Sequence, residues 1–280
     1  MRTALTIAGS DPSGGAGIQA DLKTFAAFGL YGTSAITAIT VQNTLGVSAV
    51  APLSADIVTA QIEAVAGDIE IHATKIGMLA TAAIVEAVAA AVLELELPLV
   101  VVDPVLVSTS GERLLDEDGV RALCAELLPH ARVVTPNIPE AEVLSGLRIT
   151  SRDDAREAAR RIHQLGAAAV IITGGHGFDE GTGLGAAGVR IVDLLFDGRV
   201  FHEFLAPRVE SRHTHGTGCT YASAVAAGLA LGQTLSEAAA RAQRYVAGAI
   251  AHAPAIGHGR GPLDHFWERR SGPSRTSGPS

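Results

Sequence analysis

The chain of 280 residues has only two cysteines, Cys124 and Cys219, and only two lysines, Lys23 and Lys75. Two cysteines are too few for a disulfide framework, so we expect a protein of the reducing cytoplasm. A Walker-type phosphate-binding loop is excluded because neither lysine follows a glycine.

Basic charge and long apolar runs are also scarce. Lys and Arg number 21 against 29 Asp and Glu, which gives a formal net charge of −8. Nucleic-acid binders neutralise phosphates with a basic surface, so we expect no nucleic-acid partner. The apolar stretch at residues 82–102 is interrupted by three glutamates and falls short of the roughly 18 residues that span a bilayer. We therefore expect no membrane partner, and the short apolar run before Asp11 is too brief for a signal peptide.

Hydrophobic residues make up 48% of the chain, and short β-rich runs alternate with longer runs of helical period. This alternation predicts a mostly parallel sheet covered on both faces by helices, a three-layer α/β/α sandwich. The expected strands are residues 3–8, 31–41, 73–76, 99–103, 132–135 and 168–173, and the expected helices are residues 19–28, 54–66, 81–95, 116–128, 139–145 and 151–165.

The pattern changes after residue 173. Two strand-like runs, 189–196 and 200–205, flank the dipeptide Asp197-Gly198, which predicts a β-hairpin. Two apolar helices are expected next, at residues 220–231 and 235–253. No linker divides the chain, so we expect one domain over residues 1–268, followed by a disordered tail over 269–280 that is rich in Ser, Gly, Pro and Arg.

A glycine-rich turn with the sequence HGTGCT, residues 215–220, precedes the first of these apolar helices. Glycines at a helix start let backbone N–H groups converge, and the helix dipole adds positive potential. The turn therefore predicts an anion site, although a tight turn with a buried cysteine fits the same residues. A thiol in the first turn of a helix is also expected to have a lowered pKa, which makes Cys219 a candidate base or nucleophile.

A second candidate site follows the first predicted strand. Ligands of open parallel sheets bind beyond the carboxyl ends of strands, so the loop at residues 8–17 is expected to line a pocket. Asp21, one turn into the next helix, either points into that pocket or lies on a solvated face. Gln42 and Asn43 end another strand, and an amide suits the edge of a heteroaromatic ring.

Carboxylates also follow two central strands. Asp103 ends the strand at 99–103, and Asn137 and Glu140 follow the strand at 132–135. Oxygen ligands in these places suit Mg²⁺ bound to nucleotide phosphates, whereas Asn137 could equally cap a helix. His213 and His215 have no further ligand at metal-site spacing, so a structural or orienting role is favoured over a metal pair.

These motifs together resemble the hydroxymethylpyrimidine/phosphomethylpyrimidine kinases of thiamine biosynthesis, members of the ribokinase-like superfamily. The resemblance runs from residue 3 to about residue 266. It rests on the segments LTIAGSDPSGGAGIQADLKT (5–24), QNT (42–44), TKIGML (74–79), DPV (103–105), TPNIPEA (135–141), GGH (174–176), THGTGCT (214–220) and GRGP (259–262).

The resemblance implies a ribokinase-like fold and a kinase that uses ATP and Mg²⁺. It would phosphorylate 4-amino-5-hydroxymethyl-2-methylpyrimidine and then its monophosphate, both at one site. A homodimer with a helical interface is usual in the family, and a monovalent cation remains an open question. A pyridoxal or pyridoxine kinase of the same superfamily is the main alternative, and a non-catalytic nucleotide-binding regulator is the alternative from another class.

The resemblance also implies a role for each residue of this chain that matches a site position of the family. The resemblance implies that the pyrimidine is held by Gly9, Asp21, Gln42, Met78 and Val105. It implies an anion hole at Gly216, Thr217 and Gly218 with Cys219 as the base, and nucleotide contacts from Asn137, Thr173, Gly175, His176 and Thr214. Asp103 and Glu140 are the expected metal ligands, and the glycine-rich residues 177–188 are a candidate flap over the nucleotide.

Overall fold

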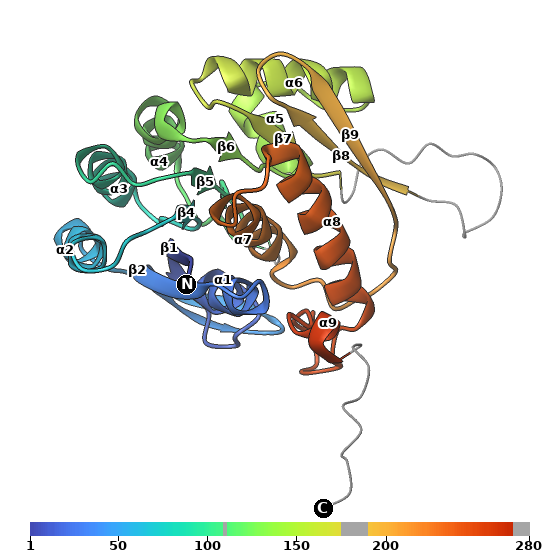
Figure 1. Cartoon of the computed structure of the whole chain (residues 1–280), viewed down its shortest axis with the longest axis horizontal. Helices are drawn as coiled ribbons and strands as arrows, with labels where there is room; N and C mark the ends of the chain where they lie inside the picture. The colour runs from blue at the N-terminus through green and yellow to red at the C-terminus, as the bar shows by residue number, and fades with distance from the viewer. Residues whose placement is uncertain (109–110, 175–189, 271–280) are drawn as a thin grey trace, which may run out of the picture.

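A single nine-stranded sheet runs through the molecule in the order β3-β2-β1-β4-β5-β6-β7-β8-β9 (Figure 1). The structure is a computed structural model that describes residues 1–108, 111–174 and 190–270. The strands from β2 through β1 and β4 to β7 are parallel, whereas β3, β8 and β9 pair antiparallel. Their bounds are β1 Thr3–Ser10, β2 Tyr31–Asn43, β3 Gly46–Pro52, β4 Ala73–Ile76, β5 Val100–Val102, β6 Val133–Val134, β7 Val170–Ile172, β8 Arg190–Phe196 and β9 Phe201–Pro207.

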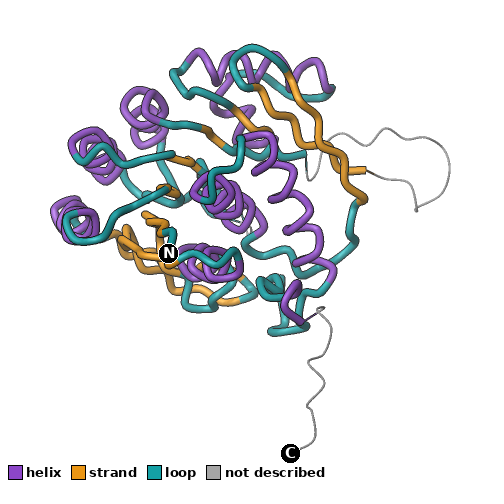
Figure 2. Tube along the Cα trace, in the orientation of Figure 1, coloured by secondary structure: helices purple, strands orange, loops and turns teal. Residues whose placement is uncertain are grey.

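Helices cover both faces of the sheet, as Figure 2 shows in purple. Helices α2, α3, α5 and α6 pack on one face, and α1, α7 and α8 pack on the other. The helices are α1 Gly17–Ala27, α2 Ala55–Ala66, α3 Ala82–Glu94, α4 Glu117–Ala122, η1 Leu123–Leu127, η2 Leu128–His130, α5 Ile138–Ser145, α6 Arg152–Gln164, α7 Thr217–Ala230, α8 Leu235–Ala251 and α9 Trp267–Arg270. The expected three-layer sandwich with a mostly parallel sheet is confirmed.

Burial on both faces explains the continuous apolar runs of the central strands. In β1, Leu5 and Ile7 pack into the cluster formed with α2 and α3, whereas Ala4 packs into the cluster formed with α1, α7 and α8. Helix α7 is the most enclosed helix of the second cluster, since residues 220–230 are all buried. Its small side chains allow the sheet, α1 and α8 to approach it closely.

The predicted hairpin is also confirmed, since β8 and β9 flank Asp197, whose Oδ1 accepts hydrogen bonds from the backbone N–H groups of Arg199 (2.9 Å) and Val200 (2.8 Å). The edge strand β3 was not predicted. Its side chains are partly or fully exposed, so its sequence lacks the alternation that a half-buried strand shows. Helix α9 reaches Arg270 and so includes two residues of the expected tail; residues 271–280 lie outside the described residues. Across the described ranges, no helix is both long and apolar enough to cross a membrane.

The parallel strands bring the sequence motifs to one edge of the sheet. β1, β4, β5 and β6 end next to the segments that carry Gly9, Met78, Asp103 and Asn137. This is the edge at which open α/β sheets bind ligands. The candidate site therefore lies at this edge.

Candidate functional site

The loop after β1 and the glycine-rich turn before α7 lie in contact. His215 Nε2 is 2.8 Å from Asp11 Oδ2, and both side chains are buried. Gly15 and Gly216 approach so closely that a Cβ on Gly216 would lie 1.9 Å from the Gly15 carbonyl oxygen. The two segments that the sequence identifies as the pocket loop and the anion site thus form one structure, although His215 and Asp11 are 204 residues apart in the sequence.

Asp11 holds the loop in shape. Its carboxylate accepts hydrogen bonds from the backbone N–H groups of Ser13 (2.8 Å), Gly15 (3.1 Å) and Ala16 (2.8 Å), and from the Ser13 hydroxyl (2.9 Å). Burial alone would raise the pKa of Asp11, but the hydrogen bonds from His215 and Ser13 outweigh it and lower the pKa below its ordinary value. The carboxylate is therefore ionised at neutral pH and orders the loop. The orienting role expected for His215 fits this contact.

The start of α7 leaves backbone donors open. Gly216 is its N-cap, has a left-handed backbone with φ of 82°, and makes no side-chain capping hydrogen bond. In the described part of the chain, the N–H groups of Gly218 and Cys219 have no backbone or side-chain acceptor. Both donors lie at the positive end of the helix dipole, which is the arrangement that binds an anion.

Cys219 does not have the lowered pKa that its position in the first helical turn predicts. Desolvation raises its pKa to about 12; Lys75 opposes this rise, whereas the nearby carboxylates Asp103 and Asp21 add to it. The side chain keeps some exposure, and a hydrogen bond from the Gly17 backbone N–H also favours the thiolate, but neither overcomes burial. The expectation of an acidic thiol is wrong, and Cys219 carries its proton at neutral pH.

Asp21 is neither on a solvated face nor open to a pocket. Its side chain is 0% exposed. Its Oδ1 accepts a hydrogen bond from Ser223 Oγ (2.7 Å), and its Oδ2 accepts from Thr6 Oγ1 (2.6 Å) and from Lys75 Nζ (3.1 Å). No surface of Asp21 is free for a substrate in this conformation, so both expectations from the sequence miss its position.

Lys75, whose side chain is also 0% exposed, links Asp21 to the metal-site candidates. Its Nζ lies 3.6 Å from Asp103 Oδ2 and 3.1 Å from Asp21 Oδ2. Burial alone would lower the pKa of Lys75, but the charges of Asp21, Cys219 and Asp103 raise it above the ordinary value. A permanent buried cation thus lies behind the glycine-rich turn. The sequence analysis did not single out Lys75, although one lysine within the buried run ATKI was the available signal.

Asp103 and Glu140 lie near the ends of β5 and β6, close enough for the charge of Asp103 to affect Glu140. Burial raises the pKa of Glu140 to about 8, with the charge of Asp103 as the next cause. Burial also raises the pKa of Asp103, which Lys75 opposes. Asp103 Oδ2 is buried and has no hydrogen-bond partner among the described residues. This oxygen is also the one that lies 3.6 Å from Lys75 Nζ, so the two carboxylates already share one buried positive charge.

Asn137 caps α5, as the alternative from the sequence proposed. Its side chain accepts a hydrogen bond from the Glu140 N–H (2.9 Å), while Glu140 Oε2 accepts from the Asn137 N–H (3.0 Å). This capping box fixes Glu140 near Asp103. Within the described ranges, no group of three or more His, Cys, Asp or Glu side chains is placed to hold a metal ion by itself.

The expected ring-side residues lie around the ends of β1, β2, β4 and β5. Gly9 lies against Met78, since a Cβ on Gly9 would be 3.3 Å from Met78 Cε. Gln42 Nε2 is 3.2 Å from His215 Nε2, which connects the end of β2 to the glycine-rich turn. Val105 is partly buried just beyond Asp103. Four of the five expected ring-side residues therefore surround the site, and Asp21 lies behind it.

Some of the residues expected to bind the nucleotide lie within the described ranges, and others lie outside them. Thr173 bridges to Asn137 at the ends of β7 and β6, and the Thr214 carbonyl accepts hydrogen bonds from the Thr217 hydroxyl (2.7 Å) and N–H (3.3 Å). Gly175 and His176, together with the candidate flap at 177–188, lie outside the described residues.

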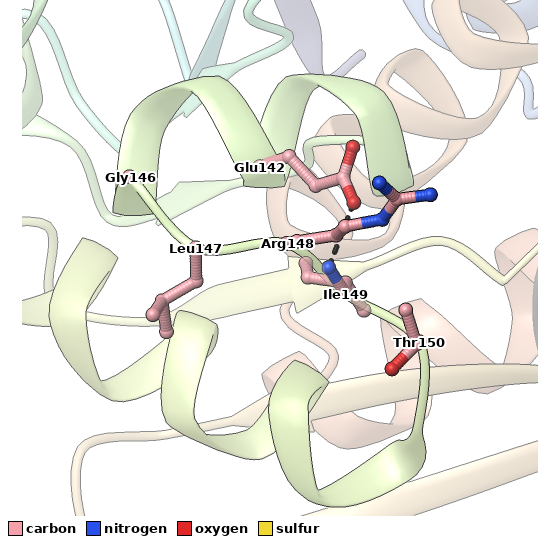
Figure 3. Close-up of a pocket in the computed structure, with 6 residues that line it drawn as sticks. All are labelled: Glu142, Gly146, Leu147, Arg148, Ile149 and Thr150. Atoms are coloured by element: carbon pink, nitrogen blue, oxygen red, sulfur yellow. Dashed lines mark hydrogen bonds between the residues drawn. The ribbon is translucent and has the colours of Figure 1, made fainter.

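A surface pocket lies elsewhere, on the connection between α5 and α6 (Figure 3). Its wall includes Glu142, whose Oε1 accepts a hydrogen bond from the Ile149 N–H (2.7 Å), and the exposed Arg148. None of the expected site residues lines it. We therefore place the functional site at the strand ends and not in this pocket.

Similarity to known proteins extends over nearly the whole chain. The family model described as phosphomethylpyrimidine kinase matches residues 11–264. The hydroxymethylpyrimidine/phosphomethylpyrimidine kinase of Bacillus subtilis (strain 168) is 45% identical over 96% of this chain and 96% of its own length. The thiamine biosynthesis bifunctional protein ThiED of Geobacter sulfurreducens is 49% identical over 94% of this chain, which spans 52% of that protein.

Among solved structures, the pyridoxal kinase from Staphylococcus aureus in complex with pyridoxal superposes with a TM-score of 0.86 at 38% identity, over 97% of this chain and 96% of that one. The ribokinase-like fold expected from the sequence is thus shared with a kinase of a related hydroxymethyl ring. The match to the family model covers residues 11–264, which include residues 11–17 of the pocket loop and the whole glycine-rich turn. The chain belongs to the phosphomethylpyrimidine kinase family.

Proposed function

We propose that this chain is an ATP-dependent kinase that phosphorylates 4-amino-5-hydroxymethyl-2-methylpyrimidine and then its monophosphate, which yields the diphosphate for thiamine biosynthesis. The observation that carries the proposal is the contact between the pocket loop and the glycine-rich turn through Asp11 and His215 at 2.8 Å. This contact sets a ring-binding region beside an anion site. Family membership supports the choice of substrate.

The glycine-rich turn supplies the main stabilisation. Phosphoryl transfer proceeds through a loose transition state, so positioning and charge neutralisation contribute more than covalent help. The open N–H groups of Gly218 and Cys219 are fixed before substrate arrives, since α7 is enclosed by the core. They would hold the transferring group without reorganisation. Lys75, buried behind them, offsets the negative charges of Asp21 and Asp103.

Cys219 assists the transfer but is not a ready-made thiolate. Its pKa of about 12 keeps the thiol protonated at neutral pH. In a loose transition state the hydroxyl of the substrate loses its proton late, after most of the charge has moved onto the phosphoryl group. We assign Cys219 to accepting that proton as a thiolate, after its own proton has passed to bulk water, so the thiol acts only through its small ionised fraction.

Mg²⁺ fits the carboxylates at the ends of β5 and β6. The buried Oδ2 of Asp103 has no hydrogen-bond partner among the described residues and lies 3.6 Å from Lys75 Nζ, and Glu140 is held nearby by its capping box. Mg²⁺ commonly uses one or two carboxylates together with substrate phosphates and waters. When bound, it would neutralise charge on the ATP phosphates. Asp103 and Glu140 are the residues that would hold it.

The ring is assigned to Gly9, Gln42, Met78 and Val105, with Met78 packed against the bare backbone of Gly9. Asp21 is moved from ring contact to a supporting role, because its oxygens are already occupied by Lys75, Thr6 and Ser223. Asp21→Asn is accordingly expected to lower the free energy of unfolding. It should also lower kcat by a larger factor than the factor by which it raises the KM for the pyrimidine. A selective rise in KM would return Asp21 to the ring site.

The proposed substrate is tested with a coupled ATP assay on the pyrimidine alcohol, its monophosphate and pyridoxal. We expect turnover of both pyrimidines and a higher kcat/KM on the alcohol than on pyridoxal. The likeness to pyridoxal kinases makes pyridoxal the second candidate. A higher kcat/KM on pyridoxal would assign the chain to that activity, and no ATP turnover on any ring would favour a nucleotide-binding regulator.

The role of Cys219 is tested by replacing it with alanine. We expect Cys219→Ala to lower kcat by roughly 10²- to 10⁴-fold, the range of a general base, with the dissociation constant for ATP changed far less. Cys124→Ala is the matched control, since Cys124 lies in η1 on the opposite face of the sheet. Full turnover by Cys219→Ala would remove the thiol from the chemistry.

A further inference from the structure

The motif GRGP, residues 259–262, is part of the family resemblance but has no role in the function proposed above. These four residues, called here the closing segment, follow α8 and run back across the site. On one side they contact the turn between β2 and β3. The backbone N–H of Gly259 donates to Thr44 Oγ1 (3.2 Å), and that of Arg260 donates to the Thr44 carbonyl (2.9 Å).

On the other side, the next residue contacts the segment that enters the anion hole. The Gly261 N–H donates to His213 Nδ1 (3.2 Å), and the Gly261 carbonyl accepts from the His215 N–H (3.2 Å). Pro262 forms a parallel bridge with His215 and lies against Gly15 of the pocket loop. The closing segment thus joins the β2–β3 turn, the approach to the anion hole and the pocket loop within four residues.

The contacts leave no room for side chains between the joined parts. A Cβ on Gly259 would lie 2.0 Å from the Thr44 carbonyl oxygen and 2.6 Å from its carbon, which are backbone atoms that cannot rotate away. The spacing between the closing segment and the β2–β3 turn therefore depends on the absence of a side chain at residue 259. Thr44 is two residues from Gln42, the ring-side residue that also contacts His215.

We propose that the closing segment is a spacer that fixes the ring-binding end of β2 relative to the anion hole, so that Gly259 and His213 are positioning residues for phosphoryl transfer. This inference rests on the proposed placement of the ring and the phosphate. Each half of the site is built by its own loop, and the closing segment sets how far apart they are. A displacement of about 1 Å between reacting groups lowers rates by about 10²-fold, whereas binding to either half alone is unaffected.

The test separates kcat from binding. For Gly259→Ala we expect kcat to fall by at least tenfold, while the separately measured dissociation constants of ATP and of the pyrimidine alcohol stay within threefold of the original values. A structural role alone would lower the melting temperature or weaken binding without this separation. His213→Leu, which removes the acceptor for Gly261, is expected to act in the same direction, and His213→Asn, whose Oδ1 replaces that acceptor, is expected to recover most of kcat.

If Gly259→Ala does not fold, the variants His213→Leu and His213→Asn still test whether the closing segment positions the two halves of the site. Values of kcat within twofold of the original in the folded variants would overturn the proposal, as would equal values for His213→Leu and His213→Asn. So would a fall in kcat that is matched by an equal loss of affinity for each ligand alone. The ratios are taken on whichever ring the original enzyme turns over best, so a preference for pyridoxal would refute the proposed substrate and still test the closing segment.

Discussion

Gly216 and Gly232 flank helix α7 and offer a matched pair of substitutions. Both have left-handed backbones, with φ of 82° and 84°. Alanine in this conformation costs roughly 1–2 kcal/mol at either position. A Cβ at Gly232 meets nothing within 4 Å, whereas a Cβ at Gly216 would lie 1.9 Å from the Gly15 carbonyl oxygen and 2.9 Å from its carbon. The Gly216→Ala variant must therefore move the glycine-rich turn away from the pocket loop by about 1 Å or more.

That movement should appear in catalysis. We expect Gly216→Ala to lower kcat/KM by about 10²-fold, because misplacement of reacting groups by about 1 Å has an effect of that size. Gly232→Ala should stay within about twofold in kcat/KM while losing roughly 1–2 kcal/mol of stability. Steady-state kinetics and urea denaturation of both variants provide the comparison. Equal activities in the two variants would refute the claim that the contact at Gly216 organises the site.

Three further predictions concern buried charges. Lys75→Met leaves Asp21 and Asp103 without their cation and should lower the free energy of unfolding by about 3–5 kcal/mol. Adding Asp21→Asn to the same chain should recover part of this loss, because it removes one of the two unpaired charges. A loss below about 1 kcal/mol for Lys75→Met in urea denaturation would contradict this prediction. Asp193, whose pKa burial raises to about 6, binds a proton in the folded state at a pH where the unfolded chain does not, so stability falls as pH rises from about 4 to 6. Asp193→Asn should remove that slope, worth up to about 3 kcal/mol. His265 has the opposite sign, because burial lowers its pKa to about 4 and stability falls as pH drops from about 6.5 to 4; His265→Gln should flatten this loss, and unchanged pH profiles of unfolding would count against both assignments.

The sequence predicted the sheet well where burial on both faces leaves a continuous apolar run, as in β4 and β5, and where turn chemistry is local, as at Asp197 between β8 and β9. It missed β3 because an exposed edge strand needs no apolar pattern. The rule that ligands bind at the carboxyl ends of parallel strands predicted the place of the pocket loop. It did not predict that the glycine-rich turn meets this loop, because the turn follows the antiparallel strand β9. The family resemblance then supplied the substrate, which the residues alone did not.

The errors at the site have one physical origin. The lowered pKa expected for Cys219 considered only the helix dipole, whereas the actual pKa is set first by desolvation and then by charges from Lys75, Asp103 and Asp21, which lie on other elements. Asp21 was misplaced for a similar reason, since its partners Lys75 and Ser223 are 54 and 202 residues away. Local spacing contains no information about such partners. The buried lysine within β4 was the available hint that a carboxylate had to lie nearby.

Residues 220–230 of α7 are all buried, and this limits how the helix can move during turnover. Because α7 packs between the sheet, α1 and α8, it cannot slide or tilt without disrupting the core. Its N-terminal end, which is the proposed binding site of the phosphoryl group, should therefore stay fixed. Any tightening around the reactants must then come from loops that approach it, such as the segment after β5 that carries Val105. Dynamics measurements across a catalytic cycle should accordingly find the amides of α7 among the quietest in the molecule.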